Sequence, residues 1–481
     1  MASYNPQPTH SLVASSIPSP NPRSPFSTTA AMAPPQPPLA SIPIPDDLLE
    51  EIFLRLPTPD ALARASAACT SFRRVIKGRA FRRRFRGLHR PPLLGFMDAA
   101  GFHHAQAPHP SAPLAGALAP RAADFSFVPA VVSSCSYYVP PGVQDDGEGP
   151  RWRPRDVRGG RVLLDWISLH PRTVRICCYH EDDAEVSILM DVNELTPRDR
   201  PTWTERERCN AADFHLAVCD PLSSRYVLLP TIPEDLAAQP QDSLWEFEPV
   251  LASNTSENGE EEPFKVICIA KYQTKLVLFV FPSTTMQWCM VESPVLPSLD
   301  QMSCFDCVRG RFYWTEPYTW SDHLMVLDTC TMRFSTVDLL TGYHQELRDL
   351  HHQNSYRGRP NSVVTGREGT LEMFSLVREN GYFALYHTSL QNNSQEWKLE
   401  KVISLPGQYH DYSISTVGAA EGFLFFQGAP KGIRIENVDC YSMEVKTYEI
   451  TKVCTRMEQF LNRKRALPCF SFPPLLLEPT I

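Results

Sequence analysis

The chain has 481 residues, a formal net charge of −8 and 43% hydrophobic residues, ordinary values for a folded protein that exclude a fully disordered or collagen-like chain. Proline is unusual, with 45 residues against 22 glycines, and because proline blocks helix interiors and central strands it argues against a mostly helical protein. The mild acidity gives no general reason to bind nucleic acid, and no apolar run approaches the roughly 18 residues of a membrane helix.

Residues 1–42 are rich in proline and serine and contain no acidic residue. Such a segment buries too little apolar surface to offset its ordering entropy, so we expect a disordered leader. Its composition also resembles a chloroplast transit peptide, an alternative for which only Arg23 supplies positive charge. The N-terminal segment has no basic region followed by an apolar core, so the sequence predicts no secretory signal. The 14 cysteines are therefore expected to be reduced.

Residues 43–88 change to apolar residues at helical spacing and predict three short helices. Pro45 opens the first helix and Pro57 ends it. Thr58 is expected to cap a second helix, and Thr70-Ser71 a third that continues through residue 85. A unit this small buries its apolar side chains incompletely, which favours a partner.

Short strands and turns follow the helices. Residues 89–155 are irregular and proline-rich and could include a first blade, residues 156–455 carry apolar runs of four to eight residues, and residues 456–481 form a tail. Many short strands at near-even spacing predict a mainly antiparallel all-β domain behind the three-helix unit, an α+β multidomain chain. A kelch-like β-propeller is the favoured architecture, and a double-sheet sandwich stays open as an alternative.

A weak internal repeat favours the propeller. Asp328 and Asp439 are 111 residues apart in similar segments, and Asp220 lies 108 residues before Asp328. Each is interpreted as a turn residue of a hairpin. The equivalent hairpin positions are then Tyr226, Trp288, Phe334, Trp397 and Val445, at steps of 62, 46, 63 and 48. Propeller repeats run roughly 40–50 residues, so this spacing suggests six or seven blades.

The helical segment Ile44-Pro45-Asp-Asp-Leu48-Leu-Glu-Glu-Ile52-Phe53-Leu-Arg-Leu56-Pro57, followed by Leu62, Phe72 and Phe81, resembles an F-box. The hairpin at 218–230 more loosely resembles the associated β domain of plant F-box proteins, especially the large grass group. The resemblance implies that the chain docks on the Skp adaptor, and through it on a cullin. By motif position the adaptor-binding residues would be Pro45, Leu48, Ile52, Phe53, Leu56, Pro57 and Leu62, some of which could instead form the core of the helical unit.

The function that this resemblance implies is substrate recognition in an SCF-type cullin–RING ubiquitin ligase, with the β domain binding a target protein. Such a subunit is not an enzyme, so no catalytic residue, metal or cofactor is expected, and neither membrane nor nucleic acid is expected as a partner. A cytoplasmic or nuclear location follows from the same role. The alternatives are a propeller scaffold outside any ligase and a carbohydrate-binding or enzymatic propeller with a helical extension.

Three further features have two interpretations each. The aromatic residues Trp314, Tyr318 and Trp320 lie in one predicted loop, where they could line a target-binding surface or pack in the core. Nine basic side chains within residues 73–90 fit either a nuclear-import or nucleic-acid patch or, as we favour, a solvated helix face. Cys304 and Cys307 have zinc-knuckle spacing without a second pair, so they are interpreted as buried thiols.

Overall fold

The computed structural model describes residues 44–98, 101–131, 151–167, 173–179, 185–191, 211–237, 244–253, 264–272, 274–293, 302, 305–315, 320, 322–353, 361–365, 370–379, 381–391, 395–406, 412–430, 437–457 and 467–471. The leader of residues 1–42, with its expected disorder and its transit-peptide alternative, lies outside this range. Within it, no helix is both long enough and apolar enough to span a membrane.

The helical unit contains four helices, where the sequence predicted three. They are α1 (Asp46–Leu54), α2 (Pro59–Ala68), α3 (Thr70–Ile76) and α4 (Arg79–Leu88). The third predicted helix is divided at Gly78, which has an extended backbone (φ −60°, ψ 133°) and serves as the N-cap of α4. Glycine is a poor residue for a helix interior, so the helix breaks at Gly78 although the apolar spacing continues on both sides of it.

Capping explains where the second and third helices begin. Thr58 caps α2 as predicted, with its Oγ1 accepting a hydrogen bond from the backbone N–H of Ala61 at 3.2 Å. The prediction for α3 is wrong by one residue: its N-cap is Cys69, whose Sγ accepts from the N–H of Phe72 at 3.4 Å. Thr70 is therefore the first residue of the helix.

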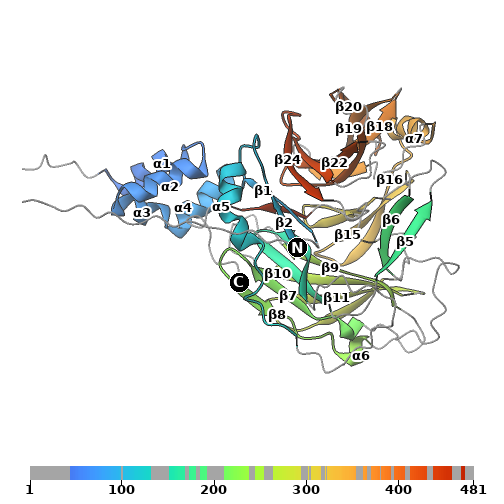
Figure 1. The fold of residues 1–481 in the computed structure, drawn as a ribbon, viewed down its shortest axis with the longest axis horizontal. Coiled ribbons are helices and arrows are strands. Elements are labelled where there is room, and N and C mark those ends of the chain that lie inside the picture. The colour runs from blue at the N-terminus through green and yellow to red at the C-terminus, as the bar shows by residue number, and fades with distance from the viewer. Residues whose placement is uncertain are drawn as a thin grey trace, which may run out of the picture. The chain divides into compact units, whose positions relative to one another are not determined.

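The described part of the chain after the helical unit forms an antiparallel propeller of six blades (Figure 1). Five of the blades have four strands each. Blade 1 is β3 (Arg151–Arg158), β4 (Arg161–Ile167), β7 (Leu216–Asp220) and β8 (Arg225–Leu228). Blade 2 is β9 (Leu244–Ser253), β10 (Phe264–Tyr272), β11 (Leu276–Pro282) and β12 (Cys289–Ser293). Blade 3 is β13 (Phe305–Val308), β14 (Arg311–Trp314), β15 (His323–Asp328) and β16 (Arg333–Asp338). Blade 4 is β17 (Asn361–Thr365), β18 (Leu371–Glu379), β19 (Tyr382–Leu390) and β20 (Trp397–Ser404). Blade 5 is β21 (Tyr412–Ala420), β22 (Phe423–Pro430), β23 (Asn437–Glu444) and β24 (Ile450–Met457).

Blade 6 is built from both ends of the propeller sequence. The strands β1 (Leu93–Asp98) and β2 (Gly101–His104) come before blade 1, and β25 (Leu467–Phe470) comes after blade 5. Antiparallel pairing of Leu93 with Phe470 and of Met97 with Leu467 joins the two ends. The segment of residues 89–155, predicted as irregular and as a possible first blade, supplies β1, β2 and the start of β3, and the predicted tail supplies β25. The blades therefore extend beyond residues 156–455 at both ends.

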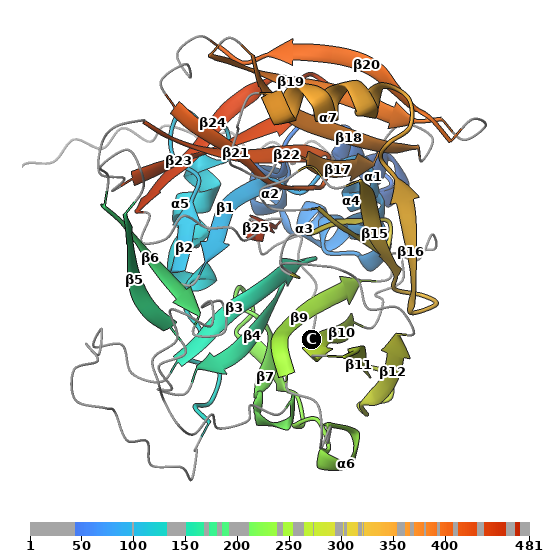
Figure 2. The ribbon, with the colours of Figure 1, turned by 90° about the vertical axis from the view of Figure 1, so that its right-hand side faces the viewer.

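Apolar clusters between successive blades establish their order around the ring, which Figure 2 shows from a second side. Val218 of blade 1 packs with Val266 of blade 2, and Ile267 of blade 2 packs with Phe312 of blade 3. Blades 3 and 4 meet through a cluster that includes Leu324 and Val363, and blades 4 and 5 through one that includes Phe374 and Leu424. A last cluster joins residues of blades 5, 6 and 1. Six separate sheets packed in sequence exclude the sandwich.

A β-ribbon and several helices lie outside the six blades. A two-stranded ribbon of β5 (Thr173–Tyr179) and β6 (Glu185–Asp191) is inserted in blade 1 between β4 and β7. The helices are α5 (Ala112–Ala122), α6 (Glu234–Ala237) and α7 (Tyr343–Gln353), with a 3₁₀ turn at Ala211–Asp213. Helix α5 packs on β1 and β2, and α7 packs on β18 and β20.

A backbone signature marks the turn before the outer strand of blades 1 to 5. One non-glycine residue with φ between 53° and 60° precedes each of these strands: Ser224, Met286, Met332, Gln395 and Tyr448. The repeat is confirmed for blades 1 to 4, because four of the five predicted hairpin positions lie two residues after this residue: Tyr226, Trp288, Phe334 and Trp397.

The fifth predicted position, Val445, is wrong, because the equivalent residue of blade 5 is Ile450. The error came from aligning Asp439 with Asp328. Asp328 ends β15 and its Oδ1 accepts hydrogen bonds from two turn N–H groups at 3.0 Å, and Asp220 does the same at 3.1 and 3.3 Å. Asp439 instead lies inside β23, where it accepts from Thr455 and Lys452 of the next strand.

Candidate functional site

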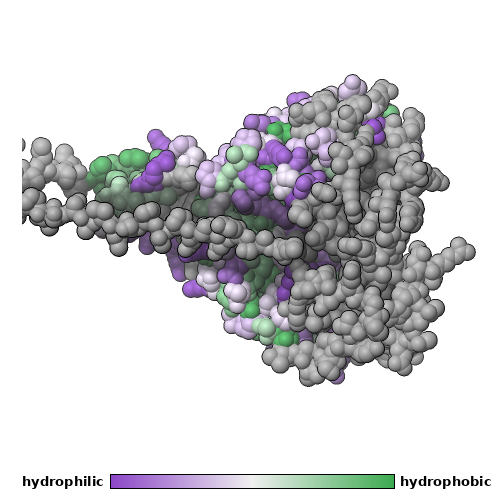
Figure 3. Space-filling model, viewed as in Figure 1, coloured by the Kyte–Doolittle hydropathy of each residue, from purple (hydrophilic) through white to green (hydrophobic). Residues whose placement is uncertain are grey.

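An exposed apolar face on α1 is the first candidate site. Leu48 and Ile52 lie four residues apart, on one side of the helix, and are 57% and 52% exposed. Pro57 is also exposed at the end of this helix, and Pro45, which directly precedes it, is exposed as well. Figure 3 shows apolar surface gathered over the helical unit, beside polar surface. Four of the seven predicted adaptor-binding residues are therefore available to a partner.

The other three predicted residues belong to the core of the helical unit. Phe53 is 3% exposed and Leu62 is fully buried, and Leu56 is partly buried against the same cluster. The ring of Phe53 contacts Phe72 at 5.1 Å and Phe81 at 6.4 Å between centroids. These side chains hold the helices together, which was the alternative open at the sequence level, and they support the exposed face from behind.

Ion pairs hold α1 against the basic helices. Both carboxylate oxygens of Asp46 accept hydrogen bonds from Arg74 at 2.8 Å, and Arg84 donates to Glu50 at 2.7 Å and to Glu51 at 2.6 Å. The hydrogen bonds to Glu51 and Glu50 raise the pKa of Arg84 above its usual value. Two members of the basic run therefore neutralise acids of the first helix.

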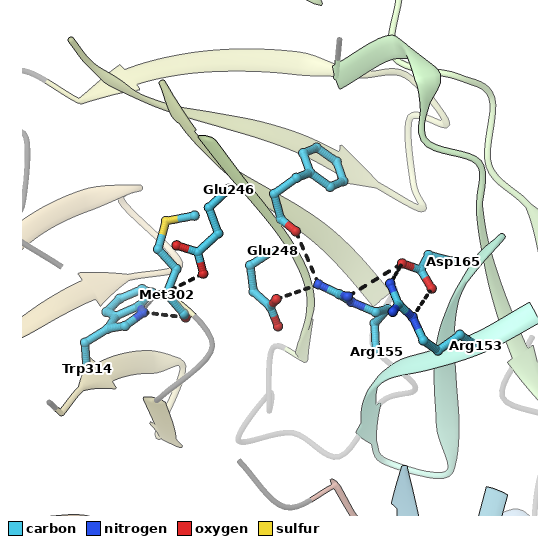
Figure 4. A network of polar contacts seen from close by, with 8 residues as sticks. Arg153, Arg155, Asp165, Glu246, Glu248, Met302 and Trp314 are labelled. Carbon is cyan, nitrogen blue, oxygen red and sulfur yellow. Dashed lines mark hydrogen bonds and ion pairs between the residues drawn. The ribbon is translucent and has the colours of Figure 1, made fainter. Parts of the chain in front are cut away.

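A second candidate lies where blades 1, 2 and 3 meet and buries several charged groups (Figure 4). Arg155 of β3 donates to Glu248 of β9 at 2.6 Å and to the carbonyl oxygen of Phe247 at 3.2 Å. Arg153 donates to Asp165 of β4 through two hydrogen bonds of 3.0 and 2.8 Å. Buried charges persist only when they are paired and hydrogen-bonded, as these are. The network joins the second blade to the first.

Hydrogen bonds continue from this network toward blade 3. The Oε1 of Glu246 accepts from the backbone N–H of Met302 at 2.9 Å, and the Met302 carbonyl accepts from the indole N–H of Trp314 at 2.8 Å. Trp314 is 2% exposed and Trp320 is 5% exposed, so neither side chain lines an accessible surface. Core packing, the alternative at the sequence level, is what the structure supports for both, and Tyr318 lies outside the described residues.

Two carboxylates join blades through backbone N–H groups. Asp156, 1% exposed, accepts from the N–H of Leu251 in blade 2 at 2.8 Å. Asp306, 2% exposed, accepts from the N–H of Val363 in blade 4 at 2.8 Å and of Ala419 in blade 5 at 3.1 Å. Asp306 stands in the otherwise apolar strand β13, which is a sequence signal for a buried carboxylate, whereas Asp156 lies in β3 among four arginines and gives no such signal.

Metal ligation finds no support in the described part of the chain, where no three His, Cys, Asp or Glu side chains cluster as ligands would. Cys307 lies in β13 and is partly buried, whereas Cys304 lies outside the described residues. The zinc interpretation of this pair therefore gains nothing from the structure.

Comparison with known families decides what the helical unit is. Residues 44–84 match the F-box domain family. The chain carries an F-box domain. Its matched residues include α1, α2 and α3 and enter α4, so the exposed face of Leu48 and Ile52 is a face of the F-box. F-box domains in general belong to non-catalytic substrate-adaptor subunits of SCF ubiquitin ligases, and a propeller suits a protein-binding domain.

Solved structures resemble the chain only at low identity, and no curated protein matches it. A post-proline cleaving enzyme from Rickettsia typhi is 12% identical with a TM-score of 0.29, over 63% of this chain and 44% of that one. The β-propeller domain of the Trilobed protease from Pyrococcus furiosus is 10% identical with a TM-score of 0.28, over 64% of this chain and 86% of that one. The chain thus spans less than half of the Rickettsia enzyme, and these scores carry no argument about activity.

Proposed function

We propose that this protein is the substrate-recognition subunit of an SCF-type cullin–RING ubiquitin ligase. Its F-box would dock on the Skp adaptor, and through it on the cullin, while the propeller binds a target protein. The role as a receptor of the kind found in plants, and a cytoplasmic or nuclear location, belong to the same proposal and rest on the sequence resemblance.

The exposed apolar face of α1 is the observation that carries the proposal. A helical unit of this size normally turns its large apolar side chains inward, and here the inward positions are already filled by Leu49, Phe53 and Leu62. Leu48 and Ile52 remain about half exposed on one side of the helix. An apolar helix face of this kind suits docking against an apolar groove of a partner.

The buried charged groups of the propeller join its blades to one another. Asp156 and Asp306 accept backbone hydrogen bonds from neighbouring blades, and Glu248 is paired with Arg155. Such groups keep the ring in one arrangement, so they are explained without a catalytic role. A scaffold outside any ligase and a carbohydrate-active propeller remain as outcomes of the test below.

Adaptor binding by the full chain tests the proposal. Full burial of a leucine or isoleucine contributes about 1.5–3 kcal/mol, and roughly half of each of these two side chains is left to bury. Truncating both, in a Leu48→Ala, Ile52→Ala double variant, should therefore weaken Skp-adaptor binding by roughly 10- to 150-fold. Titration calorimetry with purified adaptor measures the change.

Leu228→Ala is the matched control, because Leu228 is 44% exposed on β8, in the propeller. We expect it to bind the adaptor like the unchanged chain. Equal affinity in the double variant and the control would contradict docking through α1. Absence of binding by the unchanged chain would favour a scaffold role, and turnover of a sugar substrate would favour the enzymatic alternative.

A further inference from the structure

Two cysteines face each other across the outer pair of strands in blade 5. Cys440 of β23 and Cys454 of β24 are direct cross-strand partners in the antiparallel register. As direct cross-strand partners, they carry their side chains on the same face of the sheet. Both residues are buried: Cys440 is 5% exposed, and Cys454 is fully buried. Opposite residues of an antiparallel pair have Cα atoms about 4.5–5.5 Å apart, which lies inside the range of disulfides.

An arginine with two polar partners lies beside the pair. Arg456, two residues after Cys454 on the same strand, donates to Asp98 of β1 at 3.0 Å and to Gln427 of β22 at 2.6 Å. His103 of β2 also contacts Asp98, at 2.9 Å. The neighbouring Cys454 thiol and the guanidinium of Arg456 lower the pKa of Cys440 against the opposing effect of burial. The adjacent Cys440 thiol and burial raise the pKa of Cys454.

No other pair of cysteines in the described strands is placed this way. Cys219, Cys268 and Cys469 are buried, and burial raises the pKa of each thiol. Their cross-strand neighbours are other residues, such as Tyr226 for Cys219. A lowered thiol pKa favours the thiolate, the form that reacts with oxidants, and Cys454 lies directly opposite Cys440, where a resolving thiol is needed.

We propose that Cys440 and Cys454 form a reversible disulfide when the protein meets a peroxide. The Cys440 thiolate attacks one oxygen of hydrogen peroxide, the O–O bond breaks, and a sulfenic acid and hydroxide form. The Cys454 sulfur then attacks the Cys440 sulfur, the S–O bond breaks, and the oxygen leaves as water. In sum the two thiols lose two protons and two electrons, and one hydrogen peroxide is reduced to two waters. A small dithiol reverses the step by exchange.

Position in the fold gives this bond a consequence. β24 is the outermost strand of blade 5, and through Arg456 it holds Asp98 of blade 6, the blade that closes the ring. A covalent bond to β23 keeps the outer strand in place when its hydrogen bonds open. We therefore expect the oxidised protein to lose β24 less readily than the reduced one.

Mass spectrometry of the full chain tests the proposal directly. Trypsin cleaves after Arg434, Lys446, Lys452 and Arg456, so each cysteine falls in its own peptide, 435–446 and 453–456. The folded, reduced protein is treated with hydrogen peroxide, its remaining thiols are alkylated, and it is digested without reductant. We expect the two peptides to be recovered as one linked species, at least tenfold above the untreated sample, and released by dithiothreitol.

Controls separate this pair from general oxidation. Cys330 is exposed and Cys440 is buried, so Cys330 reports how much peroxide has reacted. Recovery of both peptides as alkylated thiols, at a dose that has oxidised Cys330, overturns the proposal. So does linkage of either cysteine to a third one. A Cys289→Ser variant should retain the linked species, and a Cys454→Ser variant should lose it.

Amide hydrogen exchange provides a second measurement on the unaltered chain. Exchange in residues 450–457 should slow at least threefold after peroxide treatment and return to its original rate after reduction. Equal exchange in the linked and reduced forms would contradict the proposed effect on β24.

Discussion

The buried histidine of α7 makes the stability of the propeller depend on pH. His344 is fully buried against blade 4, where its Nε2 lies 2.7 Å from the Oγ1 of Thr388 and its ring 4.5 Å from the ring of Trp397. Burial lowers the pKa of His344 to about 3 from the usual 6.5. The unfolded chain therefore binds a proton at a higher pH than the folded chain does. Stability is fully present above pH 6.5 and falls as the pH drops toward 3.

The size of the effect follows from the two pKa values. At pH 5 the histidine of the unfolded chain is almost fully protonated, and that of the folded chain is almost fully neutral. Lowering the pH from 7 to 5 should therefore remove about 2 kcal/mol of unfolding free energy through His344 alone. A His344→Gln variant keeps a polar side chain without a titrating group, so its loss over the same range should be smaller by that amount.

Urea unfolding measures the difference. The fluorescence of Trp397 and Trp320, whose rings both contact His344, reports the unfolding of this region. Comparing the variant with the unchanged chain at pH 7 and pH 5 cancels the other titrating groups, such as His109, whose pKa burial also lowers. If the two proteins lose the same free energy within about 0.5 kcal/mol, the reasoning is refuted.

Two further predictions concern the joints of the ring, and both are measured by urea unfolding. Asp306→Ala leaves two buried backbone N–H groups of blades 4 and 5 without their acceptor, which should cost roughly 2–5 kcal/mol, whereas Asp306→Asn should retain much of the stability. Gly342→Ala should cost more than about 1–2 kcal/mol, because Gly342 has φ +59° and a Cβ there would lie 2.3 Å from the Trp397 carbonyl oxygen. Gly116→Ala in α5, with open space around its Cβ position, should be neutral or stabilising, and equal losses at the two glycines would contradict the steric argument.

The F-box helices and most of the blade repeat follow from local rules. Pro45 and Thr58 mark helix starts that depend on a few neighbouring residues, and apolar spacing identifies the helical faces. The turn before each outer strand is local as well, so Tyr226 and Trp288 could be aligned without a structure. The repeat is misaligned in blade 5 because Asp439 resembles a turn residue in sequence but lies inside a strand.

Which apolar residues of α1 stay exposed was decided by tertiary packing. Leu48 and Phe53 are both large and apolar on the same helix, yet one is 57% exposed and the other 3%. Helical spacing places them on different sides of α1, but only the packing of α3 and α4 against Phe53 selects the inner side. The same holds for Trp314, which is buried in a cluster with Phe305 and whose indole N–H donates to the carbonyl oxygen of Met302.

The sequence by itself determined the kinds of element, their order and the F-box pattern, because these depend on residues that are near one another in the chain. Only the tertiary structure decided the closure of the ring, the joints made by Asp156 and Asp306, and the meeting of Cys440 with Cys454. Blade 6 takes strands from residues 93–104 and 467–470, more than 350 residues apart. Contacts over such distances form because apolar surface and buried hydrogen-bonding groups must find partners, and that requirement acts on the folded chain as a whole.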